Sequence, residues 1–294
     1  MEYVLKNQEM EVHFQSTGGT LSSVKDKNGT EYLWSGDATY WSGQAPILFP
    51  ICGSIREDQA VTESGKKLNM PRHGIIRKEE FQMEILTDDS ICFLIESKGE
   101  MLKKFPYPFQ VRSKYQLEGK KIRITYVVKN TGTEKMPFFI GGHPGFQCPL
   151  YPEEVFSDYQ IVFEKEEHST NPKPETKTGL ILVEERTKVM QDTRILPLDH
   201  SLFAVDAIIF DELESKKVQL VHKIKGHGIQ LEFQDFPYLV LWSTSNRGPF
   251  VAMEPWTGLS TCSDEDDIFE HKRNVQILEP GEEKDYSHTI EILV

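Results

Sequence analysis

Hydrophobic and polar residues alternate along much of this chain with a period of two. In the segment 121–130, Ile122, Ile124, Tyr126 and Val128 fall on one side, and mostly polar residues fall on the other. Such alternation is typical of a β-strand with one buried face, because successive side chains of a strand point in opposite directions. Similar short patterns at 217–224, 228–233, 238–243, 250–254 and 287–294 predict further strands.

Turn signals separate these predicted strands. The pair Asn28-Gly29 is a strong hairpin signal, and the segments 81–86 and 90–96, joined by an acidic turn, predict a second hairpin. Only the stretch 99–105 predicts a turn or two of helix. Regular short strands with turns between them predict an all-β fold, a large antiparallel β-sandwich.

No break in the pattern divides the chain, so we expect one β-sandwich domain over residues 1–294. With 294 residues, 38% of them hydrophobic, the chain is long enough for a full core. The polar stretch 164–179 is expected to be a solvated loop, because strand patterns continue on both sides of it. The acidic stretch 263–267 is expected to be an exposed loop, since it lacks the glycine and distal glutamate of a calcium loop.

Charge and cysteine content narrow the functional classes. The net charge of -13 argues against nucleic acid or an anionic membrane as partner and favours a small molecule. The four cysteines are far apart with no CxxC pair, which predicts reduced thiols. No run of 18 apolar residues and no signal-peptide pattern are present, so we expect a cytoplasmic protein. No feature of the sequence indicates the oligomeric state.

One histidine stands in an unusual setting. His143 lies in the stretch FIGGHPGF, where Pro144 favours an extended conformation at His143 and the glycines allow another group to come close. We expect that group to be the substrate. Glu254 stands at the end of an apolar run, just before a proline. A carboxylate in such a place needs a reason, because burying an unpaired charge is costly.

Four more polar residues stand beside glycine, proline or apolar residues: Arg56, His73, Arg77 and Asp206. Taken singly, each fits a structural role, such as a packed histidine, a surface ion pair or a turn cap. The complete set has two histidines, two arginines and two carboxylates in similar local settings. The set therefore favours one functional site.

The chain resembles the aldose 1-epimerase (galactose mutarotase-like) family, and most closely its LacX-type branch. The order and spacing of five segments carry the resemblance: PRHGIIR (71–77), GGHPGFQCPL (141–150), DAIIF (206–210), FVAMEPW (250–256) and LEPGE (278–282). The resemblance implies a large antiparallel β-sandwich. It also implies that a histidine and a glutamate interconvert sugar anomers, with no cofactor and no metal.

The resemblance assigns a role to each candidate residue. His143 matches the general acid, and Glu254, rather than Glu279, matches the general base. The substrate-binding positions are Arg56 of the early loop, His73 as second histidine, Arg77 as in the sugar-phosphate branch, and Asp206 as the acid that holds hydroxyl groups. Ile55 and Ile75 stand where galactose mutarotases usually have asparagine and glycine, which leaves the identity of the sugar open.

Mutarotation suits a base and an acid held on either side of one bond. The anomeric hydroxyl loses a proton while the ring oxygen gains one. A glutamate that is ionised at neutral pH and a histidine that titrates near neutrality are expected in these roles. Phe146 and Trp256 are the candidates for an aromatic ring that lines the apolar face of the sugar, and packing in the core is the other interpretation for both.

Three other interpretations remain. A hexose 6-phosphate is the alternative substrate, with Arg56, Arg72 and Arg77 as the anion site, because guanidinium groups suit phosphate. A metal enzyme would use His73, His143 and Glu254, although no HxH or HExxH spacing supports it. A carbohydrate-binding module without activity would leave the His/Glu pair unexplained.

Overall fold

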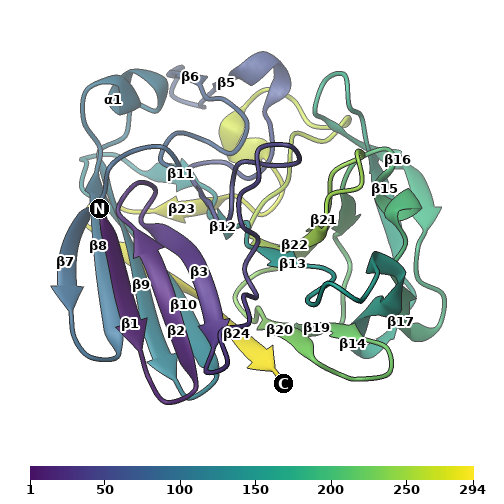
Figure 1. Ribbon diagram of the computed structural model, residues 1–294. Coiled ribbons are helices and arrows are strands. Elements are labelled where there is room, and N and C mark those ends of the chain that lie inside the picture. Colours follow the sequence, from purple (N-terminus) through teal and green to yellow (C-terminus); the bar gives the residue numbers. More distant parts are fainter.

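The computed structural model describes residues 1–294 and is built mainly from antiparallel β-sheets (Figure 1). The largest sheet has nine strands, in the spatial order β17 (Thr193–Pro197), β14 (Tyr159–Glu167), β19 (Lys217–His222), β20 (Gly228–Glu232), β24 (Glu283–Leu293), β10 (Lys121–Asn130), β9 (Phe109–Glu118), β8 (Ser90–Glu96) and β7 (Gln82–Leu86). The predicted all-β class, a large antiparallel β-sandwich, is confirmed.

A six-stranded sheet packs against the large one and carries the candidate site. Its strands are β18 (Ile208–Phe210), β21 (Tyr238–Trp242), β22 (Phe250–Trp256), β12 (Gly141–Gly142) and β4 (Ile47–Leu48), with β13 (Gly145–Gln147) also paired to β22. Phe210 of β18 contacts Phe163 of β14, with ring centroids 5.3 Å apart. The two sheets therefore share a core.

Smaller sheets complete the fold. The three-stranded sheet of β1 (Glu2–Lys6), β2 (Met10–Gln15) and β3 (Thr20–Asp26) lies in front of β8 to β10 in Figure 1. Its Phe14 packs on Tyr115 of β9 at 4.9 Å between ring centroids. Three two-stranded sheets pair β5 (Gln59–Val61) with β6 (Lys67–Asn69), β11 (Met136–Phe138) with β23 (Gln276–Leu278), and β15 (Thr170–Pro174) with β16 (Ile181–Lys188).

Helices are few and short. They are α1 (Glu100–Lys104) and the 3₁₀ helices η1 (Arg56–Asp58), η2 (Phe156–Asp158), η3 (His200–Phe203) and η4 (Phe269–His271). The helix predicted near residue 100 is confirmed as α1. No helix in the structure has the length and apolar character needed to cross a membrane.

Most local predictions are confirmed. The predicted inward face of segment 121–130 is buried in β10, β7 pairs with β8, and Gly29 takes a positive φ of 86° in its turn. The acidic stretch 263–267 is a largely exposed loop, in which Asp264 pairs with Arg273 at 2.6 Å.

The expectation of a solvated loop at 164–179 is wrong. Strand β14 runs to Glu167, and Thr170–Pro174 forms β15, where Asn171 is buried. The Asn171 amide donates a hydrogen bond to the carbonyl of Ile209 at 2.7 Å. This bond satisfies a backbone acceptor and helps to hold the buried side chain in place.

Candidate active site

A pocket of about 240 Å³ lies beside the six-stranded sheet. Its lining residues come from six separate segments of the chain: Trp41, Pro46, Arg72, His73, Arg77, His143, Asp206, Ala207, Val240, Trp242, Glu254 and Trp256. Glu254 and Trp256 are two residues apart on β22, so they lie on the same side of the strand. The cross-strand partner of Glu254 is Val240 of β21, which also lines the pocket.

The centre of the pocket is a contact between His143 and Glu254. His143 stands between β12 and β13, and its backbone N–H donates to the carbonyl of Pro46 at 3.1 Å. Its Nε2 lies 3.2 Å from Oε2 of Glu254. His143 is 6% exposed and Glu254 is 1% exposed. The histidine and the glutamate that the sequence singled out are therefore direct neighbours, largely shielded from water.

Burial changes the protonation of both partners. It raises the pKa of Glu254 well above its usual range, an effect that the charge of Arg72 opposes. It lowers the pKa of His143 to about 3. The sequence led us to expect an ionised glutamate and a histidine titrating near neutrality. In the folded protein burial pushes both groups towards their uncharged forms, a protonated Glu254 and a neutral His143.

His73 lies at one edge of the pair. It has a positive φ of 67°, unusual for a residue other than glycine, and Gly74 follows with φ 78°. A Cβ at Gly74 would lie 2.0 Å from the carbonyl oxygen of Phe49, so this tight turn requires glycine. The Gly53 N–H donates to Nδ1 of His73 at 3.2 Å. Burial lowers the pKa of His73 well below its usual range, which keeps the ring neutral.

Two arginines enter the pocket without a carboxylate partner. Arg72 and Arg77 both line it, and neither takes part in an ion pair. The Arg72 Nε lies 3.3 Å from Nε2 of His73. Burial, together with the nearby charge of Arg72, lowers the pKa of Arg77 below its usual value. The pocket therefore holds positive charge in a protein whose net charge is -13.

The structure brings together five of the six predicted residues, and Arg56 is the exception. Its guanidinium binds Asp267 through Nε at 2.9 Å and the carbonyl of Glu265 at 3.2 Å, and it does not line the pocket. Asp206 does line the pocket, but it is partly exposed just before β18 rather than buried in an apolar run. Its Oδ1 accepts the N–H of Ala207 at 2.8 Å, which leaves the other oxygen available.

Aromatic residues form much of the wall, and the sequence identified only one of them. Trp256 lines the pocket with a buried Nε1 that has no hydrogen-bond partner. Phe146 is 1% exposed in the core and does not line the pocket. Trp41 and Trp242 were missed, because single tryptophans in a loop and a strand do not differ in sequence from residues of the core.

The glycines around His143 make room for other side chains of the protein. A Cβ at Gly141 would lie 2.9 Å from Sγ of Cys52, one at Gly142 would lie 2.9 Å from the hydroxyl of Tyr126, and one at Gly145 would lie 2.9 Å from the ring of Trp41. Contacts with the protein's own side chains therefore explain these glycines without the expected role in admitting the substrate. They allow tight packing around the histidine.

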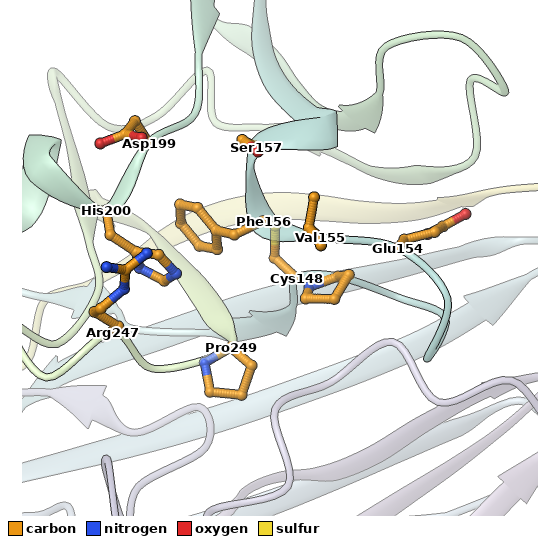
Figure 2. Close-up of a pocket in the computed structure, with 10 residues that line it drawn as sticks. Cys148, Glu154, Val155, Phe156, Ser157, Asp199, His200, Arg247 and Pro249 are labelled. Atoms are coloured by element: carbon orange, nitrogen blue, oxygen red, sulfur yellow. The ribbon is translucent and has the colours of Figure 1, made fainter.

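A second hollow, of about 340 Å³, lies elsewhere and contains none of the six predicted residues. Figure 2 shows Arg247 beside His200, with Cys148 and Pro249 nearby. The ring of His200 stacks on Phe156 with centroids 3.9 Å apart. No group of three or more His, Cys, Asp and Glu side chains anywhere in the protein is arranged to hold a metal ion.

Comparison with known proteins gives close relatives. The chromosomal and plasmid LacX proteins of Lactococcus lactis subsp. lactis are each 45% identical over 298 residues, covering 100% of both chains. A galactose mutarotase related enzyme from Lactobacillus acidophilus superposes with a TM-score of 0.93 at 28% identity, covering 100% of this chain and 98% of that one. A galactose mutarotase-like protein from Lactobacillus casei gives 0.92 at 28% identity, with 100% of both chains covered.

More distant proteins share the fold. A putative aldose 1-epimerase from Escherichia coli K12 superposes with a TM-score of 0.77 at 17% identity, covering 100% of this chain and 99% of that one. A family model described as aldose 1-epimerase matches residues 1–292. This chain belongs to the aldose 1-epimerase family.

Proposed function

We propose that this protein is a mutarotase that interconverts the α and β anomers of an aldose. The observation that carries the proposal is the contact of 3.2 Å between His143 Nε2 and Glu254 Oε2 in a water-shielded pocket. His143 Nδ1 makes no hydrogen bond within the protein, and the contact of Glu254 Oε2 with His143 lacks good hydrogen-bond geometry. Buried polar atoms are normally satisfied, so atoms of this kind beside a pocket support a polar ligand there.

A pair that shares one proton provides what ring opening needs. The unprotonated partner accepts the proton of the anomeric hydroxyl, while the protonated partner donates to the ring oxygen. The bond between C1 and the ring oxygen breaks, and C1 becomes an aldehyde carbonyl. Rotation about C1–C2 presents the other carbonyl face, and reclosure returns both protons. Glu254 is proposed as the base and His143 as the acid of the opening step. These roles require the shared proton to lie on His143 when the sugar is bound, whereas burial alone favours it on Glu254.

The surrounding residues suit the recognition of hydroxyl groups. Asp206 offers a carboxylate oxygen, Trp256 offers an indole N–H beside Glu254, and His73 offers a neutral ring. The indole of Trp242 suits the apolar face of a pyranose. No step of this scheme requires a cofactor.

The direct test is polarimetry on freshly dissolved α-anomers of free hexoses and pentoses. The proposal expects at least one sugar to reach its equilibrium rotation faster with the protein than in buffer alone. Binding of a sugar without any acceleration would support a carbohydrate-binding module instead. Stoichiometric iron, manganese or zinc in the purified protein would support the metal-enzyme alternative.

A hexose 6-phosphate is the second candidate substrate, favoured by the unpaired Arg72 and Arg77 in the pocket. Guanidinium groups bind phosphate oxygens through two parallel hydrogen bonds, which lysine cannot reproduce. The rate of exchange between anomers, measured by NMR, compares each free sugar with its 6-phosphate. An Arg77→Met variant should then lose the preference for the phosphate and keep the rate on the free sugar.

A further inference from the structure

The imidazole of His143 is held by other rings rather than by a hydrogen bond at Nδ1. Its Nε2 faces Glu254, and its Nδ1 is buried without a hydrogen-bond partner. In most functional histidines the second ring nitrogen is hydrogen-bonded, and that bond fixes the orientation of the ring. Another contact has to take over this role here.

Trp41 lies against the face of this imidazole. The two ring centroids are 4.7 Å apart and the planes make an angle of 30°. Trp242 and His73 also contact the imidazole, at 5.6 Å and 5.4 Å, but their rings meet it at 80° and 87°. Of the three neighbouring rings, only Trp41 is stacked.

The local chain is shaped around this stack. The Trp34 indole N–H donates to the backbone carbonyl of Trp41 at 2.8 Å, and Phe250 stacks on the Trp41 ring at 5.5 Å. A Cβ at Gly43 would lie 2.6 Å from the Trp41 ring, and one at Gly145 would lie 2.9 Å from it. Two glycines therefore leave space for one indole, and Gly145 is only two residues from His143.

We propose that Trp41 is a positioning residue for His143: its indole face fixes the imidazole beside Glu254 and stabilises the ring when it is protonated. An aromatic face attracts a cation within about 6 Å of its centroid, more strongly where water is excluded. This attraction opposes the burial that disfavours a charged imidazole. The catalytic part of this inference rests on the proposed function, whereas the orientation of the ring does not.

Four charged or titratable groups also face His143, and they act in both directions. An ionised Glu254, 3.2 Å from Nε2, favours a protonated ring, whereas Arg72 and Arg77 disfavour it. The fourth group, His73, is itself neutral. A substitution at Trp41 leaves all four in place, so an altered His143 then results from the loss of the indole and not from a lost charge.

The experiment compares Trp41→Leu, Trp41→Phe and the control Tyr40→Leu. Tyr40 is in the same loop, packs edge-on against Trp34 at 6.1 Å and does not line the pocket. The first readout is the NMR position of the His143 ring protons, assigned with His143→Asn, because a stacked indole shifts them through its ring current. The second is kcat and KM for mutarotation. Urea unfolding checks that each variant folds, and Trp41→Met replaces Trp41→Leu if that variant does not.

The proposal expects Trp41→Leu to remove the ring-current shift and to lower kcat roughly 5- to 30-fold with little change in KM. Trp41→Phe should keep most of the ring-current shift and most of kcat, and Tyr40→Leu should match the wild type. Unchanged His143 resonances in Trp41→Leu would overturn the positioning role. A loss confined to KM would overturn it too, and would make Trp41 a substrate contact. If no sugar is turned over even by the wild type, the proposed function fails, but the NMR readout still shows whether the stack of Trp41 on His143 exists.

Discussion

Replacing Gly142 by alanine tests how tightly the protein packs beneath its histidine. Gly142 lies in β12, directly before His143, and its φ is not positive, so the backbone itself tolerates alanine. The added Cβ would lie 2.9 Å from the Tyr126 hydroxyl and 3.3 Å from Cε1 of His288. Both side chains are buried, at 3% and 2% exposure, and cannot swing out into solvent.

The structure gives the expected size of the effect. Overpacking a buried site typically costs about 1–3 kcal/mol of unfolding free energy. If β12 shifts instead of the side chains, His143 moves with it, and a displacement of about 1 Å at a reacting group costs roughly 100-fold in rate. We therefore expect Gly142→Ala to lower the urea midpoint and to reduce kcat.

The double variant Gly142→Ala/Tyr126→Phe makes this prediction specific. Removing the hydroxyl leaves Cε1 of His288, at 3.3 Å, as the nearest atom to the new Cβ. The two substitutions should therefore be non-additive, with a coupling of at least about 0.5 kcal/mol.

Urea unfolding and mutarotation kinetics measure stability and kcat for the wild type, Gly142→Ala, Tyr126→Phe and the double variant. Additive changes in stability for Gly142→Ala and Tyr126→Phe would refute the reasoning, because they would show that the Cβ and the hydroxyl do not compete for the same space. Wild-type stability in Gly142→Ala would refute it more simply.

Two further predictions concern other carboxylates. Asp206→Asn should mainly raise KM, by the equivalent of about 1–3 kcal/mol of binding, since Asp206 is expected to accept hydroxyl hydrogen bonds; a large fall in kcat at constant KM would instead place it in the chemistry. Glu154 stabilises the fold in a pH-dependent way: burial alone would raise its pKa, but hydrogen bonds from Lys225, Tyr159 and His227 lower that pKa to about 2, below the usual 4.5. Its contribution is therefore complete above about pH 4.5 and is lost as the pH falls towards 2, so Glu154→Gln should flatten the decline in urea midpoint across that window.

The sequence predicted most of what depends on short-range pattern. The alternation in segment 121–130 became β10, and the signals around residue 100 became α1. His143 and Glu254 were found because glycine, proline and apolar neighbours mark them, and because the resemblance gave the pair a role. Their contact joins residues 111 positions apart in the sequence.

Features that depend on long-range partners could not be predicted. Arg56 binds Asp267, 211 residues away in the sequence, and therefore lies outside the site that the resemblance assigned to it. The polar stretch 164–179 forms strands because β16 pairs with it and because the carbonyl of Ile209 accepts a hydrogen bond from the Asn171 amide. The stack of Trp41 on His143 joins two aromatic rings whose separate sequence settings give no sign of contact.

The central claim is that Glu254 and His143 act as one acid–base pair, and the rate of Glu254→Gln tests it most directly. The amide keeps the shape of the side chain and removes the proton acceptor. Glu279→Gln is the matched control, because Glu279 lies in the turn before β24 and pairs with Lys135 at 2.7 Å outside the pocket.

On a sugar that the wild type accelerates, folded Glu254→Gln should lose about 10²–10⁴ in kcat, and Glu279→Gln should lose nothing. Adding His143→Asn should lower the rate little further, because groups that act as a unit are non-additive. The wild type should show a bell-shaped dependence of kcat/KM on pH, since only the singly protonated pair is active. Near-wild-type mutarotation by folded Glu254→Gln would contradict the account.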